Sequence, residues 1–240
     1  MIVLFTDYGI EGPYIGQVQA VLLQSAPGTG IINLFLDAPR QNPMASAYLL
    51  SACSGGFPEG TIFFCVVDPG VGSDADKPVV LKIDGNWFVG PDNGLFDLVI
   101  RRSKQVECWK IAWRPERLSS SFYGRDLYAP VCAGLANGAG PPGDKIEWQD
   151  QHDWPDDIPE IIYFDHFGNA MTGMRAGKLD KGSVINIAGN TINNAVTFAE
   201  VPAGQVFWYE NSNGLVEIAV NQGSAQDVLQ LHIGDLVSQL

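Results

Sequence analysis

Three aspartates follow stretches that are apolar enough to form buried strands. Asp7 comes after residues 2–6 and Asp68 after residues 61–67, while Asp92 lies in a Gly-Pro-Asp-Asn-Gly segment. In an α/β sheet, ligands bind outside the carboxyl ends of the strands, where a carboxylate can accept hydrogen bonds from a sugar diol or orient a water molecule. From position alone Asp7 could equally cap a helix, and the other two are also typical turn formers.

Two further segments, residues 121–126 and 164–169, mix polar and aromatic side chains. Either could be core followed by a turn, and a lone histidine such as His166 is more often structural than catalytic. The aspartates could also hold magnesium for phosphoryl chemistry. That chemistry commonly places a second acid two residues after the first, where this chain has Gly9, so we rank it low.

Sequence motifs of several common chemistries are absent. The chain has no GxxxxGK[ST], GxSxG or HExxH, and its one GxGxxG, at 138–143, lies in a Gly- and Pro-rich segment after an expected helix instead of after a strand. Phosphate-loop, α/β-hydrolase and zinc-peptidase chemistry therefore have no support in the sequence. The cysteines show no CxxC pairing and lie among apolar residues, so we expect reduced, buried thiols, no disulfide and no metal site. They are Cys53, Cys65, Cys108 and Cys132.

The charge of the chain limits its partners. Its 240 residues include 14 basic and 27 acidic side chains, which give a formal net charge of −13. Such a surface repels a phosphate backbone and anionic lipid, so we expect neither a nucleic-acid nor a membrane partner. No basic region precedes the apolar amino-terminal stretch, and no apolar run approaches the roughly 18 residues of a spanning helix. We therefore expect a cytoplasmic protein.

The first 140 residues predict an α/β sandwich-like domain with a mainly parallel sheet. β-branched runs alternate here with helical periodicity, which is typical of strands covered by helices. The expected elements are strands over 2–6, 31–36 and 61–67, helices that begin after Pro13 and at Pro43, a hairpin over 79–89 and a helix over 127–137.

The rest of the chain predicts a linker and a second, smaller domain. Residues 141–159 are rich in Gly, Pro and acidic side chains whose spacing matches no calcium loop, so we expect a solvated linker. From residue 160 to 240 helical periodicity fades and short apolar runs recur, which predicts a small β-barrel or sandwich domain. The expected strands cover 161–164, 184–187, 196–198, 206–209 and 215–220, with a short helix near 225–229.

Taken in order, six segments resemble the S-adenosylmethionine (SAM) hydroxide adenosyltransferases, the family that also contains the fluorinases and chlorinases. Each segment is short, but the ordered set covers nearly the whole chain and is specific. The segments are TDYG at 6–9, VVDPGVG at 66–72, GPDNG at 90–94, FYGRD at 122–126 with Ala129-Pro130, DHFGN at 165–169, and 211–220, which begins with NSNG and ends with EIAV.

The resemblance implies an α/β domain, a β-barrel domain and a homotrimer with sites between subunits. It also implies that a small nucleophile attacks the 5′ carbon of SAM and releases methionine, with SAM as the substrate and no cofactor. Because the leaving group is a neutral thioether, no acid has to protonate it. The protein must hold the ribose, align the nucleophile and strip its water. By match to the family segments, Asp7 would hold the ribose hydroxyls.

The same match assigns substrate contacts to the second half of the chain. Asn169 would bind the methionine end or the ribose. Asn211, Ser212 and the neighbouring backbone would contact adenine. Trp208 or Tyr209 could stack on the adenine ring, or equally belong to the core of the barrel.

The segments that would handle the nucleophile depart from the pattern of the hydroxide-using members. Those members pair the Asp of the VDPGVG turn with an Arg shortly after it and with a His in a Phe-His-Gly-Arg-Asp segment. This chain keeps Asp68 but has Ala75 where the Arg would fall and Tyr123 where the His would be. Tyr123-Gly124 instead resembles the halide-using branch, in which the Gly leaves room for chloride, although that branch lacks the Asp.

Asp68 favours water as the nucleophile. A carboxylate beside a halide would repel it by roughly 4 kcal/mol for unit charges about 4 Å apart at an effective dielectric of about 20. The same carboxylate can orient water or take its proton. We therefore expect a SAM hydrolase in which Asp68 acts on water and Tyr123 shapes the pocket. The alternatives are a halide adenosyltransferase, another nucleophile or nucleoside substrate, and a catalytically silent SAM- or adenosine-binding protein.

Overall fold

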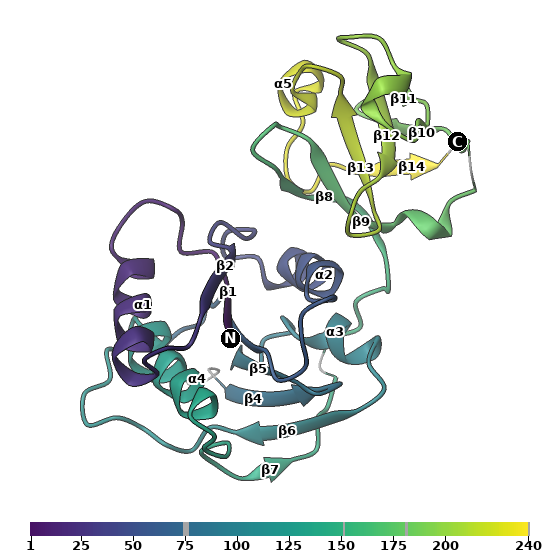
Figure 1. Ribbon diagram of the computed structural model, residues 1–240. Helices are drawn as coiled ribbons and strands as arrows, with labels where there is room; N and C mark the ends of the chain where they lie inside the picture. The colour runs from purple at the N-terminus through teal and green to yellow at the C-terminus, as the bar shows by residue number, and fades with distance from the viewer. Residues whose placement is uncertain (74–76, 151, 181, 240) are drawn as a thin grey trace. The chain divides into compact units, whose positions relative to one another are not determined.

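The chain folds into two compact units (Figure 1). The computed structural model describes residues 1–73, 77–150, 152–180 and 182–239. The units are Met1–Asp153 and Trp154–Leu240, so the division falls inside the segment expected to be a linker. None of the helices in the described residues has the length and hydropathy needed to cross a bilayer.

A seven-stranded sheet forms the centre of the first unit, with the order β2-β1-β3-β5-β4-β6-β7. The pairings make β2, β1, β3, β5 and β6 run in one direction and β4 and β7 in the other, so the sheet is mainly parallel, as predicted. The strands are β1 (Ile2–Thr6), β2 (Ile31–Phe35), β3 (Ile62–Val66), β4 (Pro78–Ile83), β5 (Asn86–Pro91), β6 (Val106–Lys110) and β7 (Lys145–Ile146).

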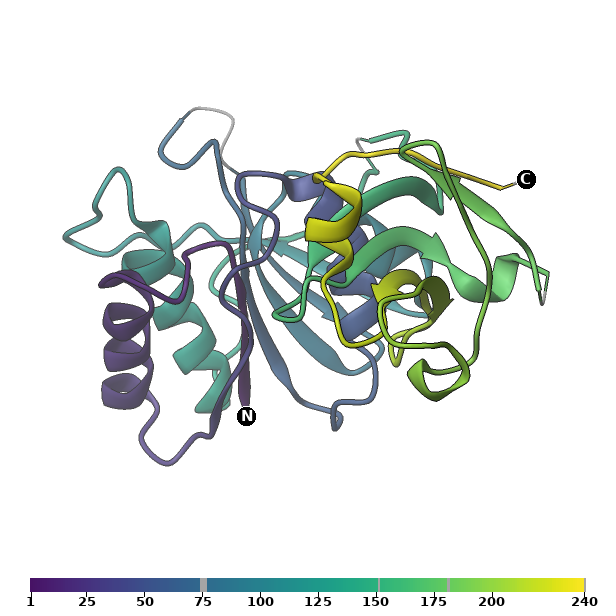
Figure 2. The same ribbon diagram turned by 90° about the horizontal axis from the view of Figure 1, so that it is seen from above.

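Helices cover the sheet. Helix α1 (Tyr14–Ser25) packs beside α4 (Ala129–Ala136), and Figures 1 and 2 show both on the same side of the sheet. Their apolar side chains share one core with Ile2 and Leu4 of β1, which alternate toward this face. Helix α2 (Pro43–Cys53) begins after Asn42, whose side chain accepts a hydrogen bond of 3.0 Å from the backbone N–H of Ala45.

The predicted strands, helices and hairpin of the first unit are confirmed, and four short elements of the described residues are additional. These are α3 (Asp97–Arg101), β6, the π-helical turn Gly124–Tyr128 and β7, and all are five residues or shorter. The acidic segment after residue 141 is not simply solvated. Asp150 accepts a hydrogen bond of 2.8 Å from Arg101, and His152 Nδ1 lies 2.9 Å from the buried Asp97, so this part of the segment is fastened to α3.

The second unit contains two antiparallel sheets with the orders β12-β13-β9-β8 and β11-β10-β14. Single bridges, Glu160 with Leu236 and Asn194 with Trp208, connect the edges of the two sheets. The predicted α/β class of the chain is confirmed. The elements are β8 (Ile158–Phe164), β9 (Ala170–Arg175), β10 (Ile185–Ile187), β11 (Asn190–Ile192), β12 (Val206–Glu210), β13 (Leu215–Val220), α5 (Ala225–Leu229) and β14 (Val237–Gln239).

One predicted strand, over residues 196–198, is wrong. Val196 is 78% exposed, and its backbone N–H donates a 2.8 Å hydrogen bond to the Glu200 carboxylate instead of to a neighbouring strand. The chain then enters a 3-10 turn, Phe198–Glu200, that packs Phe198 edge-on against Phe207. The local side-chain bond therefore competes successfully with strand pairing here.

The backbones of β5 and β3 lie close together at Gly90. A Cβ at Gly90 would lie 2.0 Å from the backbone oxygen of Cys65. This clash can be removed only if the backbone of one of the two strands moves. We expect Gly90→Ala to lower the free energy of unfolding by about 3 kcal/mol, measured by urea titration.

Gly16 provides the matched control. It lies within α1 with no atom within 4 Å of the added Cβ, so Gly16→Ala should raise the free energy of unfolding by about 0.5–1 kcal/mol. A Gly90→Ala protein as stable as the unsubstituted protein would contradict the expected clash.

Candidate functional site

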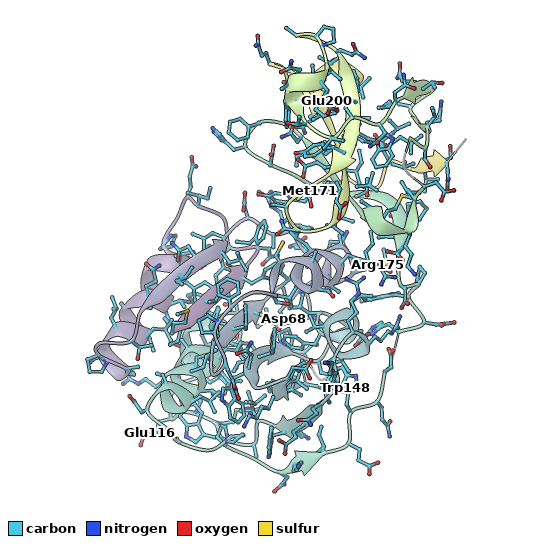
Figure 3. The ribbon with its side chains drawn as sticks, turned by 45° about the vertical axis from the view of Figure 1, so that its right-hand side comes forward. Asp68, Glu116, Trp148, Met171, Arg175 and Glu200 are labelled. Carbon is cyan, nitrogen blue, oxygen red and sulfur yellow. The ribbon has the colours of Figure 1, made fainter. Side chains whose placement is uncertain are left out.

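A cavity of about 370 Å³ lies in the first unit at the carboxyl ends of β1 and β3. These strands are neighbours and parallel, with Thr6 opposite Val66. Asp7 and Asp68 follow the two strand ends, and both line the cavity. Asp68 is labelled in Figure 3, where it lies among the side chains of the first unit. The sheet therefore brings together two carboxylates that are 61 residues apart in the sequence.

The two carboxylates have different surroundings. Asp7 Oδ2 accepts a 2.9 Å hydrogen bond from the backbone N–H of Gln41. Burial raises the pKa of Asp7, and this hydrogen bond and the charge of Arg40 oppose the rise. Asp68 Oδ1 accepts a 3.1 Å bond from the Gly70 N–H, so Asp68 also forms the expected turn. Arg40 is the one basic side chain among the described residues that line the cavity.

The predicted residues Tyr123 and Gly124 line the same cavity. Gly124 begins a π-helical turn, Gly124–Tyr128, which runs directly into α4. The turn is stabilised by Asp126, which pairs with Arg125 at 2.6 Å and accepts a 2.9 Å bond from the Ser119 N–H. π-helical turns often occur at functional sites.

The space beside Gly124 is occupied by Tyr8. A Cβ at Gly124 would lie 2.0 Å from the Tyr8 hydroxyl oxygen, so the glycine makes room for this hydroxyl. Tyr8 also lines the cavity, and burial together with the charges of Asp7 and Asp68 raises its pKa. Ala75, where the family has an Arg, lies outside the described residues.

The second unit has a cavity of its own, of about 500 Å³, that contains the predicted residues Asn169 and Tyr209. Asn169 is only 5% exposed. Its backbone N–H and its Nδ2 each donate a 2.8 Å hydrogen bond to the Asp165 carboxylate. Its Oδ1 is a buried acceptor with no hydrogen-bond partner within the described ranges.

Two of the other predicted residues of the second unit, Tyr209 and Asn211, contact the buried Glu217. Its carboxylate accepts hydrogen bonds from the Tyr209 hydroxyl and, at 2.7 Å, from Asn211 Nδ2. Asn211 Oδ1 accepts from two backbone N–H groups of the following turn, in which Ser212 is exposed. Trp208 is 3% exposed in the core and donates to the Ser183 carbonyl at 2.9 Å, so of the two aromatic candidates only Tyr209 lines the cavity.

Sequence reasoning did not assign site roles to Tyr8, Arg40, Asp165 or Glu217. Tyr8, Asp165 and Glu217 lie within segments that resemble the family, but no pattern in the sequence distinguishes them from their neighbours. Arg40 carries no local signal, because only the path of the chain after β2 brings it beside Asp7.

The family comparison covers both halves of the chain. A family model described as the SAM hydroxide adenosyltransferase N-terminal domain matches residues 2–144, and one described as the C-terminal domain matches residues 159–238. A protein of Thermus thermophilus named (R)-S-adenosyl-L-methionine hydrolase is 35% identical, over 95% of either chain. A protein of Salinispora arenicola with the same name is 33% identical, over 96% of this chain and 94% of its own.

A solved structure has a similar fold. The crystal structure of an uncharacterized conserved protein from Thermotoga maritima matches with a TM-score of 0.89 and 29% sequence identity. The match covers 100% of this chain and 99% of that chain, so the similarity includes both units.

The buried Glu217 yields a prediction for the pH dependence of stability. Burial raises its pKa above the usual 4.5. Its contribution to stability is therefore complete below that pH and is lost as the pH rises through the pKa of the folded state. Glutamine does not titrate, so the free energy of unfolding of Glu217→Gln should rise relative to the unsubstituted protein as the pH increases above 4.5, measured by urea titration.

A surface glutamate should behave in the opposite sense. Lys145, 2.6 Å away, lowers the pKa of Glu107, so its contribution is present above the usual pKa and is lost as the pH falls. Glu107→Gln should therefore be the less stable protein at high pH. Parallel pH profiles for Glu217→Gln and the unsubstituted protein would contradict the raised pKa of Glu217.

Proposed function

The chain belongs to the SAM hydroxide adenosyltransferase family, and on this basis we propose that it hydrolyses SAM to adenosine and methionine. The observation that carries the proposal is the cavity in which Asp68 and Asp7 lie together at neighbouring strand ends. The relatives from Thermus and Salinispora, which are named SAM hydrolases, support the same reaction.

In the proposed reaction a water oxygen attacks the 5′ carbon of SAM. The carbon–sulfur bond breaks, and its electron pair stays on sulfur as the neutral thioether of methionine. The attacking water loses one proton, which Asp68 accepts and then passes to solvent. Asp7 accepts hydrogen bonds from the ribose hydroxyls and so fixes the 5′ carbon relative to Asp68.

The remaining residues of the cavity shape it and balance its charge. We assign to Tyr123 and Gly124 the wall of the pocket, held by the Arg125–Asp126 pair. Arg40 is our candidate for the basic group that replaces the missing Arg, because it lines the cavity and its charge acts on Asp7.

Two alternative functions follow from the residues that differ from the pattern of the hydroxide-using members in the segments that would handle the nucleophile. A halide adenosyltransferase is disfavoured because the Tyr8 hydroxyl fills the space beside Gly124 and two carboxylates line the cavity. A silent SAM-binding protein is favoured by one observation, the replacement of the family Arg and His by Ala75 and Tyr123. Product formation separates these alternatives from hydrolysis.

We extend the proposal to the second unit and to the assembly. Asn169, Tyr209, Asn211 and Ser212 would contact the methionine end and the adenine of SAM, supported by the free acceptor of Asn169. The resemblance supports a homotrimer, which light scattering of the purified protein would test. The cytoplasmic location stays a prediction from the sequence.

Asp68→Asn tests the reaction itself. Asparagine keeps the shape of the side chain but cannot take a proton, so kcat should fall by about 100- to 10,000-fold while SAM binding by calorimetry changes little. The assay is mass spectrometry of the products in oxygen-18-enriched water, with and without chloride, and Asp144→Asn on the surface is the control.

The products decide among the candidates. Labelled adenosine that depends on Asp68 supports hydrolysis. A 5′-chlorinated nucleoside would assign the protein to the halide branch, and binding without either product would mean a silent binder. Unchanged turnover in Asp68→Asn would remove the role assigned to Asp68.

Asp7→Asn tests the ribose contact. Replacing a charged acceptor by an amide should raise the KM for SAM by about 10- to 100-fold with a smaller change in kcat, since the lost hydrogen bonds are to bound substrate. Glu11→Gln, an exposed acid four residues away, removes the same charge and should leave KM unchanged. An equal rise in both variants would indicate a general charge effect instead of a contact.

A further inference from the structure

The Tyr8 side chain forms part of the wall of the cavity of the first unit. It directly follows Asp7, and the charges of both Asp7 and Asp68 act on it. It lines the same cavity as both carboxylates. The phenol is therefore a third polar group in this cavity, in addition to the two carboxylates that the proposed reaction already uses.

Packing fixes the direction of the Tyr8 hydroxyl. The ring stands edge-on to Phe122, with the ring centroids 5.7 Å apart, and is tilted against Tyr14 at 6.1 Å. Its apolar part packs on the core that α1 and α4 share with the sheet. Its hydroxyl end fits against the backbone of Gly124, where a Cβ would be 2.0 Å from the oxygen. Only a glycine at 124 leaves the hydroxyl in this position.

The surroundings also fix the protonation state. Burial and the two neighbouring carboxylates raise the pKa of Tyr8, so the hydroxyl stays protonated through the neutral pH range. A protonated phenol can donate one hydrogen bond. Among the described residues, no group accepts a hydrogen bond from the Tyr8 hydroxyl. The donor therefore remains available to a molecule in the cavity.

We infer that the Tyr8 hydroxyl is a catalytic group that donates a hydrogen bond to the attacking water, beside Asp68. This inference rests on the proposed hydrolysis. The water gives one hydrogen to Asp68 and accepts the Tyr8 hydrogen bond at one lone pair, which leaves its other lone pair to form the bond to the 5′ carbon. The phenol proton stays on Tyr8 throughout, and the carbon–sulfur electron pair leaves with methionine.

The hydrogen bond from Tyr8 orients the water. With one hydrogen held by Asp68 and one lone pair held by Tyr8, the remaining lone pair is directed at the 5′ carbon. The contact is to the water and not to SAM, so the hydroxyl contributes to kcat more than to KM. In this role Tyr8 supplies a polar contact to the nucleophile in a chain whose Tyr123 and Ala75 depart from the family pattern.

The test is Tyr8→Phe in the full chain, which keeps the ring and removes the oxygen. We expect kcat for adenosine formation to fall by about 10- to 100-fold, with KM for SAM and the melting temperature nearly unchanged. The control is Tyr48→Phe, which alters a buried tyrosine of α2 outside the cavity and should keep its kcat.

Gly124→Ala is a second test, because this substitution keeps the Tyr8 hydroxyl but displaces it. It should also lower kcat, and it should lower it less in the Tyr8→Phe background, where the 2.0 Å contact no longer exists. Full kcat in Tyr8→Phe, or additive effects of the two substitutions, would overturn the role of Tyr8. If the unsubstituted protein forms no adenosine from SAM, the proposed hydrolysis fails, and the role of Tyr8 fails with it.

Discussion

The parallel pairing of β1 with β3 is the constraint on which the first cavity depends. Thr6 stands opposite Val66, and the chain leaves the two strands at the same edge of the sheet, so Asp7 and Asp68 meet there. The register is fixed by burial on both faces, because a slip of one residue would turn the core side chains of β1 to the opposite face. The position of the carboxylates is therefore a consequence of core packing rather than of loop structure.

The second unit positions its polar groups by another device, a buried hydrogen-bond network. Glu217 holds the side chains of Tyr209 and Asn211, and Asp165 holds Asn169 through two hydrogen bonds. Burying a carboxylate is unfavourable, which is why the pKa of Glu217 is raised, and its two partners offset part of that cost. The network leaves the side chains that face the cavity with little freedom to reorient, which suits a binding surface.

The sequence predicts the class, the mainly parallel sheet and the strand ends that carry Asp7 and Asp68, because these follow from long apolar runs and strong helix signals. It misses α3, β6 and β7, which are too short for a periodicity, and it predicts a strand at 196–198 where Glu200 captures the backbone. Tyr8 and Arg40 could not be assigned either, since their places depend on contacts with Gly124 and Asp7, which are distant in the sequence.

The charge of the cavity argues for a neutral nucleophile. SAM carries its positive charge on sulfur, and attack by neutral water moves that charge toward the attacking oxygen until a base removes the proton. A carboxylate beside the oxygen follows this movement and stabilises the transition state, whereas a carboxylate beside sulfur would favour the substrate. Attack by a halide instead neutralises an anion against the cation, and the same carboxylate would repel the anion before the reaction began. In the proposed reaction Asp7 binds the ribose and Asp68 the nucleophile, so the charge of each acid would act where it favours the reaction.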